Sequence, residues 1–571
     1  MAIKSTADKV ATIQKGYTLE GPTIELGAAI IDGELHKEAP VRLPLAMMNR
    51  HGLVAGATGT GKTVTLHMMA EQLSAAGVPV FLADIKGDLS GLATAATGSE
   101  KLLTRTESIG QPWSGKTFPV EFLALGGDGN GIPVRATITS FGPILLSRIM
   151  ELNETQESSL QLVFHFADTN NLELIDLKDL RAVIQFLTSD EGKDELEELG
   201  GLSKATAGVI LRELITLDAQ GMEKFFGEPE FDTAELLRTA PDGRGVVSCL
   251  ELPTLQTRPV LFSTFLMWLL ADLFEELPEA GDLDKPKLVF FLDEAHLLFN
   301  GASRAFLDAI TTTVRLIRSK GVGIFFVTQT PKDVPADVLG QLANRVQHAL
   351  RAYTPEDAKA LKATISTFPI SDYDLEETLT SAGIGEAVIT VMNEEGAPTP
   401  VALTRLRAPE SVMGPSAAAL VSSTVAGSAL LPKYGTAVDN VSAYEKITGK
   451  AGHDDAGPAA AERSAAGRSV AQGGGAFDPN DVDADARRIE EEILGRPSSR
   501  PAPAPERARE PERAAPRQSQ QDNGSMVGDL AGILGGALGG GLKSMARSLG
   551  TQLGRELLRG VFGTAPKRRR R

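Results

Sequence analysis

Residues 51–63 decide the fold, and they read His51-Gly52-Leu53-Val54-Ala55-Gly56-Ala57-Thr58-Gly59-Thr60-Gly61-Lys62-Thr63. The apolar start predicts a short buried strand, and the rest has the pattern G-x-x-x-x-G-K-T. Glycines at this spacing let the backbone wrap around a phosphate, so that successive N–H groups point inward. Lys62 to Ala76 then has the pattern of a helix, and Val78 to Ala83 that of a second buried strand. We therefore predict a parallel β-α-β unit with a phosphate-binding loop between its first strand and its helix.

The phosphate-binding loop supplies the first candidate site residues. We expect Lys62 to reach the β and γ phosphates of a bound nucleotide, and the Thr63 hydroxyl to bind Mg²⁺. A chance glycine-rich turn is the alternative, and the strand before the loop and the helix after it count against that alternative. The expected ligands are therefore ATP and Mg²⁺. The nucleotide-contacting residues are predicted to be Gly56, Ala57, Thr58, Gly59, Thr60, Gly61, Lys62, Thr63 and Val64.

A second motif is the apolar strand Leu288–Leu292 followed by Asp293 and Glu294. The first acid at such a strand end can hold the Mg²⁺ shell, and the second can accept a proton from the attacking water. Two solvated acids that merely cap the strand are the alternative. Because transfer of a phosphoryl group to water needs a base beside the metal, the pair predicts ATP hydrolysis rather than a small-molecule kinase or a nucleotide switch.

Three further polar segments are candidates for the site. The strand pattern Gly323–Thr328 ends at Gln329, which we expect to sense the γ phosphate, although a polar turn would explain the same residues. Asp84 and Lys86 follow the second core strand, at the edge where open α/β sheets bind ligand, so they belong either to a site or to a charged turn. Residues 151–156 indicate a helix cap or an interface segment.

Four arginines are candidates for stabilising phosphate charge in a neighbouring subunit. Arg315 and Arg318 lie on the helix predicted after the acidic pair, and Arg345 and Arg351 come later. We select Arg315 and Arg345 as catalytic candidates. An isolated arginine is more often a surface ion-pair partner, so that alternative stays open for each of them.

The order of the motifs indicates an α/β fold with a RecA-like P-loop NTPase core, interrupted by a mostly helical insertion. Apolar residues recur at helical spacing between residues 144 and 217, and a hairpin is expected around 120–123 and 134–137. After residue 410 the composition becomes rich in Ala, Gly, Pro, Ser and charge. We predict a short β-rich N-terminal element (1–48), the first part of the core (49–98), the insertion (99–240), the second part of the core (241–410), a disordered linker (411–525) and a glycine-rich amphipathic tail with a basic terminus (526–571).

Composition limits the class of protein. The chain has 571 residues, more than one compact core normally holds, and a formal net charge of −17. Its one cysteine, Cys249, excludes a disulfide scaffold and fits a reducing compartment. No apolar run has the length of a signal peptide or a membrane span, so we expect a soluble cytoplasmic protein. The net charge argues against a wholly basic nucleic-acid coat protein, but it leaves the partner open because a basic pore can lie inside an acidic surface.

With these motifs, the chain resembles the HerA-type branch of the HerA/FtsK motor superfamily, and more narrowly the stand-alone bacterial HerA-like helicase-domain ATPases. The resemblance covers about residues 15–410. It implies a hexameric ring with ATP sites between subunits and double-stranded DNA in a central pore. It also implies phosphate and metal roles for Lys62 and Thr63, metal and base roles for Asp293 and Glu294, and the sensor role for Gln329. The strings that carry it are residues 51–63, Asp84-Ile85-Lys86-Gly87-Asp88-Leu89-Ser90-Gly91, Leu292-Asp293-Glu294-Ala295-His296 and Thr328-Gln329-Thr330-Pro331.

We therefore expect an ATP hydrolase that acts as a DNA translocase or helicase-like motor, with DNA-backbone contacts that weaken as salt rises. The alternative is a protein-remodelling or membrane-associated ATPase without a nucleic-acid substrate. The tail at residues 526–571 bears on this choice, because its apolar segment and terminal arginines could dock on the protein's own ring, on a membrane surface or on nucleic acid.

Overall fold

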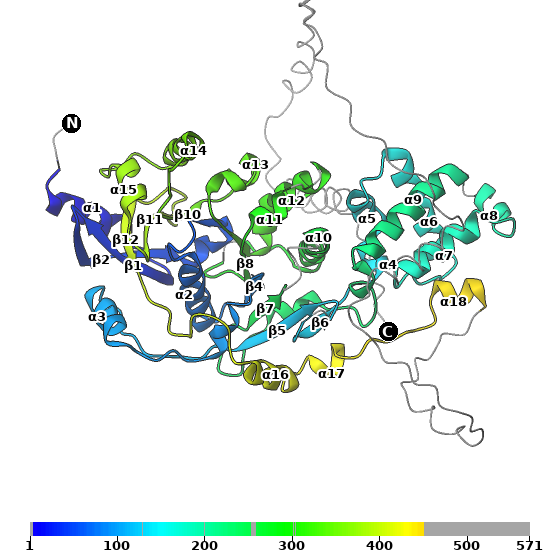
Figure 1. Ribbon diagram of the computed structural model, residues 1–571, viewed down its shortest axis with the longest axis horizontal. Coiled ribbons are helices and arrows are strands. Elements are labelled where there is room, and N and C mark those ends of the chain that lie inside the picture. The colour runs from blue at the N-terminus through cyan, green and yellow to red at the C-terminus, as the bar shows by residue number, and fades with distance from the viewer. Residues whose placement is uncertain are drawn as a thin grey trace, which may run out of the picture. The chain divides into compact units, whose positions relative to one another are not determined.

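Twelve strands in the described part of the chain form one sheet, in the order β2-β1-β12-β11-β10-β3-β9-β8-β4-β7-β5-β6. The computed structural model describes residues 4–449 except 128, 199, 253–258, 282, 301 and 303. These residues all lie in one of the two units into which the chain divides. Helices connect the parallel strands, which gives the predicted α/β fold class (Figure 1).

The centre of the sheet is parallel and buried. β3 (Gly52–Ala55), β9 (Val322–Thr328), β8 (Leu288–Leu292), β4 (Val80–Asp84) and β7 (Val247–Glu251) lie next to one another in this order. Every residue of β3, β9, β8 and β4 is buried. These strands appear in the sequence as continuous apolar runs because a parallel sheet is covered on both faces. The strands β3, β4, β8 and β9 were predicted from such runs, and they are confirmed.

Helices cover both faces of this parallel region. The apolar side chains of α2 (Lys62–Ala75) pack against one face, and those of α10 (Pro259–Glu276) and α12 (Arg304–Ile317) pack against the other. The alternation is visible in β8, where Phe290 belongs to the core on the α10 face and Phe291 to the core on the α2 face. The site at the end of β8 is therefore held by two separate cores.

The N-terminal strands extend this same sheet. β1 (Thr23–Ile31) pairs antiparallel with β2 (Glu34–Pro44) and with β12 (Ala402–Leu406). β12 pairs with β11 (Glu386–Thr390), and β11 pairs with β10 (Asn344–His348), which is parallel to β3. The β strands expected near the N-terminus are thus present. No local pattern in the sequence indicates that β1 pairs with β12, which lies more than 300 residues further along the chain.

The hairpin predicted around residues 120–123 and 134–137 is wrong. β5 (Val120–Leu125) and β6 (Ile132–Val134) are parallel neighbours, whereas a hairpin has antiparallel strands. β5 also pairs in parallel with β7, so both strands extend the main sheet. Gly126 and Gly127, with φ of +57° and +80°, allow the short return between them. An apolar alternation indicates a strand but not its direction, which is why the sequence pattern misled us.

A group of helices follows β6, as the apolar spacing predicted (Figure 1). The cap expected within residues 151–156 is confirmed at the start of α6. Asn153 Oδ1 accepts the N–H of Gln156 at 3.0 Å, and the Gln156 side chain accepts the N–H of Asn153 at 3.0 Å. The four helices with the expected spacing are α5 (Pro143–Ile149), α6 (Glu154–Thr169), α7 (Leu177–Leu187) and α9 (Lys204–Ala219).

The prediction of a disordered linker from residue 411 is wrong for residues 411–449. Tyr434 in this stretch is fully buried, and its ring lies 5.1 Å from that of Phe231. A few buried anchors of this kind order a segment whose average composition is polar. The predictions for residues 450–525 and for the tail at 526–571 lie outside the described residues. The helices in the ordered stretch are α16 (Ala418–Ala426), α17 (Leu431–Tyr434) and α18 (Ala443–Thr448).

Shorter helices complete the described part of the chain, and none of its helices has the length and apolar content needed to cross a membrane. α14 (Pro355–Ile365) and α15 (Leu375–Ser381) lie between β10 and β11 in the sequence, and they share a small apolar core with Val388 of β11. The remaining helices are α1 (Thr6–Gly16), α3 (Glu100–Ser108), α4 (Ile138–Phe141), α8 (Lys193–Glu198), α11 (His296–Phe299) and α13 (Ala336–Leu339).

Candidate functional site

The loop predicted to bind phosphate lies at the carboxyl end of β3 and leads into α2. Gly59 and Gly61 have φ of +77° and +113°, a region that favours glycine. A side chain at Gly61 would lie 3.3 Å from the backbone nitrogen of Gly385, which precedes β11. The loop therefore presents bare backbone to a phosphate, and the dipole of α2 favours an anion at the same place.

The end of β10 supports this loop. The N–H of Ala57 donates to the carbonyl of Ala349 at 2.9 Å, and Nε2 of His348 lies 2.9 Å from the Thr65 hydroxyl on α2. His348 is fully buried, and burial lowers the pKa of its ring to about 4, so the ring is neutral at pH 7. No sequence pattern marks His348, because its role depends on β10 lying beside β3.

Lys62 and Thr63 occupy the positions that the motif predicts. Lys62 Nζ donates to the carbonyl oxygens of Gly56 (2.7 Å) and Ala57 (3.2 Å). Burial lowers the pKa of Lys62, and the charges of Glu294 and the neighbouring aspartate oppose this shift. Thr63 is partly buried on the first turn of α2. An ammonium, a hydroxyl and nearby carboxylates form a donor set that fits ATP with Mg²⁺.

The acidic pair follows β8, two strands from the phosphate-binding loop. Asp293 is 5% exposed, and burial raises the pKa of its carboxyl to about 6, although the charge of Lys86 opposes this shift. The N–H of Glu294 donates to Asp293 Oδ1 at 2.9 Å. Glu294 has φ of +48°, which is uncommon for a residue with a side chain. Backbone strain of this kind clusters at functional sites.

Lys86 is the cationic partner of Glu294, because its Nζ donates to Glu294 Oε1. Burial acts to raise the pKa of Glu294, but the hydrogen bond and charge of Lys86 outweigh it, and the pKa is lowered. Nδ1 of His296 lies 3.2 Å from Glu294 Oε2, but not in the orientation of a hydrogen bond. Glu294 is therefore a buried, ionised carboxylate with one oxygen held and the other without a hydrogen-bond partner among the described residues.

Asp84 holds the loop that carries Lys86. Its carboxylate accepts the backbone N–H groups of Gly87 (2.7 Å), Asp88 (3.2 Å) and Leu89 (2.9 Å). Burial raises the pKa of Asp84 to about 6, and these hydrogen bonds oppose the shift. The sequence left a site role and a charged turn open for this string. The geometry gives a different role to each residue: Asp84 fixes the turn, and Lys86 contacts the acidic pair.

Gln329 is exposed one residue beyond the end of β9. The preceding residue, Thr328, lies opposite Ala55 of β3, and its carbonyl accepts the N–H of Gly56 at 3.2 Å. Gln329 is thus adjacent to a residue that contacts the start of the phosphate-binding loop. Its sensor role stays a prediction.

Arg315 and Arg318 lie at the opposite edge of the sheet. Together with Arg50 and His51 they line a hollow of about 160 Å³ at the amino ends of β3 and β9. Burial lowers the pKa of Arg318, and the charge of Arg50 adds to this effect. None of the described residues that line the hollow is acidic. We call it the arginine hollow; sequence reasoning missed Arg50, because no motif connects it with the other two arginines.

Arg345 and Arg351 belong to β10 and the segment after it. Arg345 is partly buried, and its Nη1 donates to the carbonyl of Thr367 at 3.4 Å. Arg351 is exposed beyond the carboxyl end of β10. β9 has seven residues, so roughly 20 Å separates the arginine hollow from the phosphate edge. The structure therefore does not bring Arg315 to the phosphate-binding loop of its own chain.

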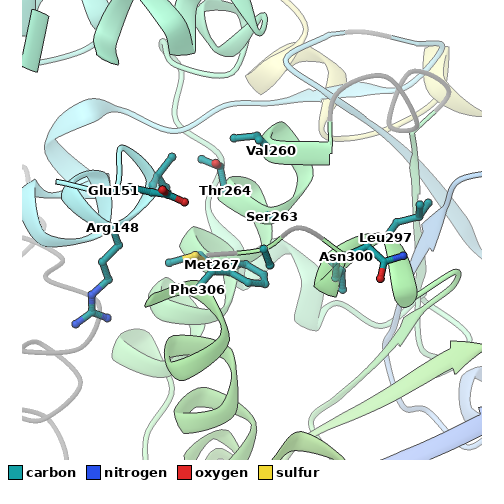
Figure 2. Close-up of a pocket in the computed structure, with 12 residues that line it drawn as sticks. Arg148, Glu151, Val260, Ser263, Thr264, Met267, Leu297, Asn300 and Phe306 are labelled. Atoms are coloured by element: carbon teal, nitrogen blue, oxygen red, sulfur yellow. The ribbon is translucent and has the colours of Figure 1, made fainter. Parts of the chain in front are cut away.

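A second hollow lies beside α11, which follows the acidic pair. Figure 2 shows side chains from α5, α10, α11 and α12 around it. Leu297 of α11 lines it, as does Glu151, whose φ is +51°. Thr264 on α10 is 1% exposed, and its hydroxyl has no hydrogen-bond partner among the described residues. The lining includes no residue of the phosphate-binding loop, so this hollow is separate from the candidate site.

Comparisons with known sequences point to one family. The sequence pattern of the family described as "Helicase HerA-like C-terminal" matches residues 30–494. The chain is similar to the DNA double-strand break repair helicase HerA of Saccharolobus solfataricus, with 23% identity over 368 residues. It is also similar to the protein of the same name from Sulfurisphaera tokodaii, with 24% identity over 396 residues. The match to the first relative covers 64% of this chain and 66% of that relative, which is just under two thirds of its length. The match to the second covers 68% of this chain and 70% of that relative.

The solved structures to which this chain is similar include a conjugative coupling protein and VirB4. The bacterial conjugative coupling protein TrwBdeltaN70, in its unbound monoclinic form, has a TM-score of 0.46 at 15% identity, and the match covers 72% of this chain and 94% of that one. VirB4 of Thermoanaerobacter pseudethanolicus has a TM-score of 0.44 at 14% identity, with coverage of 68% and 97%. Likenesses of this size carry no conclusion about activity.

Proposed function

Because the chain belongs to the HerA-like helicase C-terminal family, we propose that it is an ATP-driven motor that translocates along or unwinds DNA. The chain is a P-loop ATPase that uses ATP with Mg²⁺. The observation that carries the ATPase part of this proposal is the position of Lys62, Asp293 and Glu294 at the carboxyl ends of β3 and β8. A cationic phosphate ligand, a metal-binding carboxylate and a proton acceptor are the groups that hydrolysis of a nucleoside triphosphate requires.

The phosphate and metal ligands act first in this proposal. Bound Mg²⁺-ATP supplies the phosphorus that water attacks and the metal charge that stabilises the phosphate oxygens. Lys62 exchanges the carbonyl oxygens of Gly56 and Ala57 for phosphate oxygens. Thr63 and Asp293 would hold a bound Mg²⁺, Thr63 through its hydroxyl and Asp293 through its carboxylate.

Glu294 is the proposed proton acceptor for the attacking water. Lys86 holds Oε1, so Oε2 is the oxygen that remains to take the proton. The lowered pKa of Glu294 keeps the carboxylate ionised at pH 7, as a base must be. Gln329, at the end of the strand between β3 and β8, is the proposed sensor of the γ phosphate.

The arginine hollow points to a neighbouring copy of the chain. Roughly 20 Å separates it from the phosphate-binding loop of its own chain, so the phosphate that Arg315, Arg318 or Arg50 serves belongs to another molecule. A contact of this head-to-tail kind repeats around a closed ring, and we propose a homo-hexamer. Arg345 is the less favoured candidate, because its guanidinium already donates to Thr367.

Double-stranded DNA is the proposed partner, bound through its phosphate backbone. The support is the name of the two relatives, which are DNA double-strand break repair helicases. The chain has a net charge of −17. DNA would therefore bind a local region of positive charge, such as a pore, rather than the protein surface as a whole. The proposed location is the cytoplasm. A protein-remodelling or membrane-associated ATPase is the alternative, and the arginines at 568–571 are what favours a membrane surface.

ATP turnover with and without double-stranded DNA tests the proposal, with Glu294→Gln as the control for the site. We expect DNA to stimulate turnover, the stimulation to fall as salt rises, and the Glu294→Gln variant to be inactive. Turnover that Glu294→Gln abolishes but that DNA leaves unchanged would refute the DNA motor and favour the alternative. Turnover that survives in Glu294→Gln would refute the role assigned to Glu294.

A further inference from the structure

The two sides of the phosphate-binding loop differ in chemistry. On one side of β3 lie β9 and β8, which end in Gln329 and in the acidic pair. On the other side lie β10 and β11. If Asp293 and Glu294 act at the γ phosphate, as the proposed function states, the γ phosphate lies on the β8 side of the loop. The other phosphates then cross the loop toward β10. The ribose and base then emerge on the β10 side.

Gly385 contacts the loop on this β10 side. Its N–H donates to the carbonyl of Thr60 at 3.1 Å, and its carbonyl accepts a hydrogen bond from Arg105 Nη2 at 2.9 Å. Its φ is +74°, and a side chain here would lie 2.7 Å from Arg105 Nη2. The backbone is therefore fixed against the loop from both ends, and this fixes the position of the preceding residue, Ile384.

Two large apolar side chains are exposed on the two chain segments that contact the loop on this side. Ile384 is 75% exposed and Tyr353 is 84% exposed. Tyr353 comes four residues after Ala349, whose carbonyl accepts the N–H of Ala57 in the loop. Exposed apolar side chains of this size, close to a phosphate site, indicate a surface that a ligand covers.

We propose that Tyr353 and Ile384 form the surface that contacts the purine base of the bound nucleotide. A tyrosine ring and a branched aliphatic side chain match the flat apolar face of a base. The backbone N–H and carbonyl of Gly385 are both occupied by Thr60 and Arg105, so this backbone is not free to read the edge of the base. The surface can therefore contact the face of the base.

Ile370 provides a matched control on the same connection between β10 and β11. It is 102% exposed, but the residues after it are tied to the N-terminal part of the chain. Asp372 forms an ion pair with Lys4 at 2.8 Å, and the Tyr373 hydroxyl donates to the carbonyl of Ile30 in β1 at 2.9 Å. β1 lies four positions from β3 in the sheet, a separation of roughly 19 Å. A substitution at Ile370 therefore removes apolar surface without touching the proposed base site.

Calorimetric titration of the full-length chain tests the inference. The wild type, the double variant Tyr353→Ala/Ile384→Ala and Ile370→Ala are each titrated with a non-hydrolysable ATP analogue and with inorganic tripolyphosphate, both with Mg²⁺. We expect the double variant to bind the ATP analogue about tenfold more weakly. Its affinity for tripolyphosphate should stay within about twofold of the wild type, because that ligand has no base. Ile370→Ala should match the wild type for both ligands.

Two results would overturn the inference. The first is equal affinity of the wild type and the double variant for the ATP analogue. If light scattering then also shows a changed oligomeric state, the surface contacts another copy of the chain. The second is an equal loss of affinity for the analogue and for tripolyphosphate, which would mean that the loop itself is damaged. If the wild type binds neither ligand, the proposed function fails, and this inference fails with it.

Discussion

Replacing Lys86 by methionine tests how the acidic pair is held. The change removes the ammonium that donates to Glu294 and keeps an unbranched side chain of similar length. Asp84 continues to hold the turn through Gly87, Asp88 and Leu89, so the loop itself should persist. We expect the variant to fold and to bind ATP, but to hydrolyse it about tenfold more slowly, because the base loses its orientation.

The magnitude follows from the environment of the pair. A hydrogen bond to a charged group contributes roughly 1.5–3 kcal/mol. The side chain of Lys86 is 45% exposed and that of Glu294 is 9% exposed, so water screens the lysine end, and the lower limit of about 1.5 kcal/mol applies. An energy of about 1.4 kcal/mol corresponds to a factor of ten. The left-handed φ of Glu294 makes this support more important, because the strained turn must be held by its contacts.

Steady-state phosphate release gives kcat and KM separately. In Lys86→Met, kcat should fall about tenfold and KM for ATP should stay within about twofold, whereas Lys86→Arg should keep most of kcat. A rise in KM with unchanged kcat would show that Lys86 contacts ATP directly. Unchanged kcat and KM in Lys86→Met would also refute the reasoning, because Glu294 would then work without Lys86.

Three other variants test separate parts of the structure. Asp84→Ala should lower the free energy of unfolding by about 1–3 kcal/mol, measured by chemical denaturation, because three backbone N–H groups lose their acceptor. Burial lowers the pKa of His348 to about 4 in the folded chain, whereas the usual pKa of histidine is about 6.5. The contribution of His348 to stability is therefore complete above about pH 6.5 and falls as the pH drops toward 4. His348→Gln should reduce this pH dependence of the melting temperature. Arg318→Ala and Lys62→Ala chains should each be inactive alone but should recover turnover when mixed, and absence of recovery would argue against a phosphate shared between copies.

The parts of the site that lie within one short string could be predicted from the sequence. The glycines, Lys62 and Thr63 are contiguous, and the acidic pair directly follows an apolar run. A strand, a tight loop and a helix are local structures, so their signals are local as well. The topology of the parallel strands agrees with the predicted strands, and the region that matches the family pattern contains both strings.

The parts that depend on strand order could not be predicted. Lys86 and Glu294 are 208 residues apart, and Thr65 and His348 are 283 apart, so each pair meets only because of the order of β3, β4, β8 and β10. Arg50 joins Arg318 for the same reason. The wrong hairpin has this cause too, since strand direction is fixed by β7, far along the chain from β5.

The order of the strands also explains why one chain leaves the proposed machinery incomplete. β3 carries the phosphate-binding loop at its carboxyl end, whereas Arg50 precedes its amino end. β9 likewise ends beside Gln329 and begins just after Arg318. The proposed sensor and the arginine hollow are therefore at opposite ends of one buried strand, and no small side-chain movement brings them together. If both act on one phosphate, two copies must stack head to tail, and this association closes most simply as a ring.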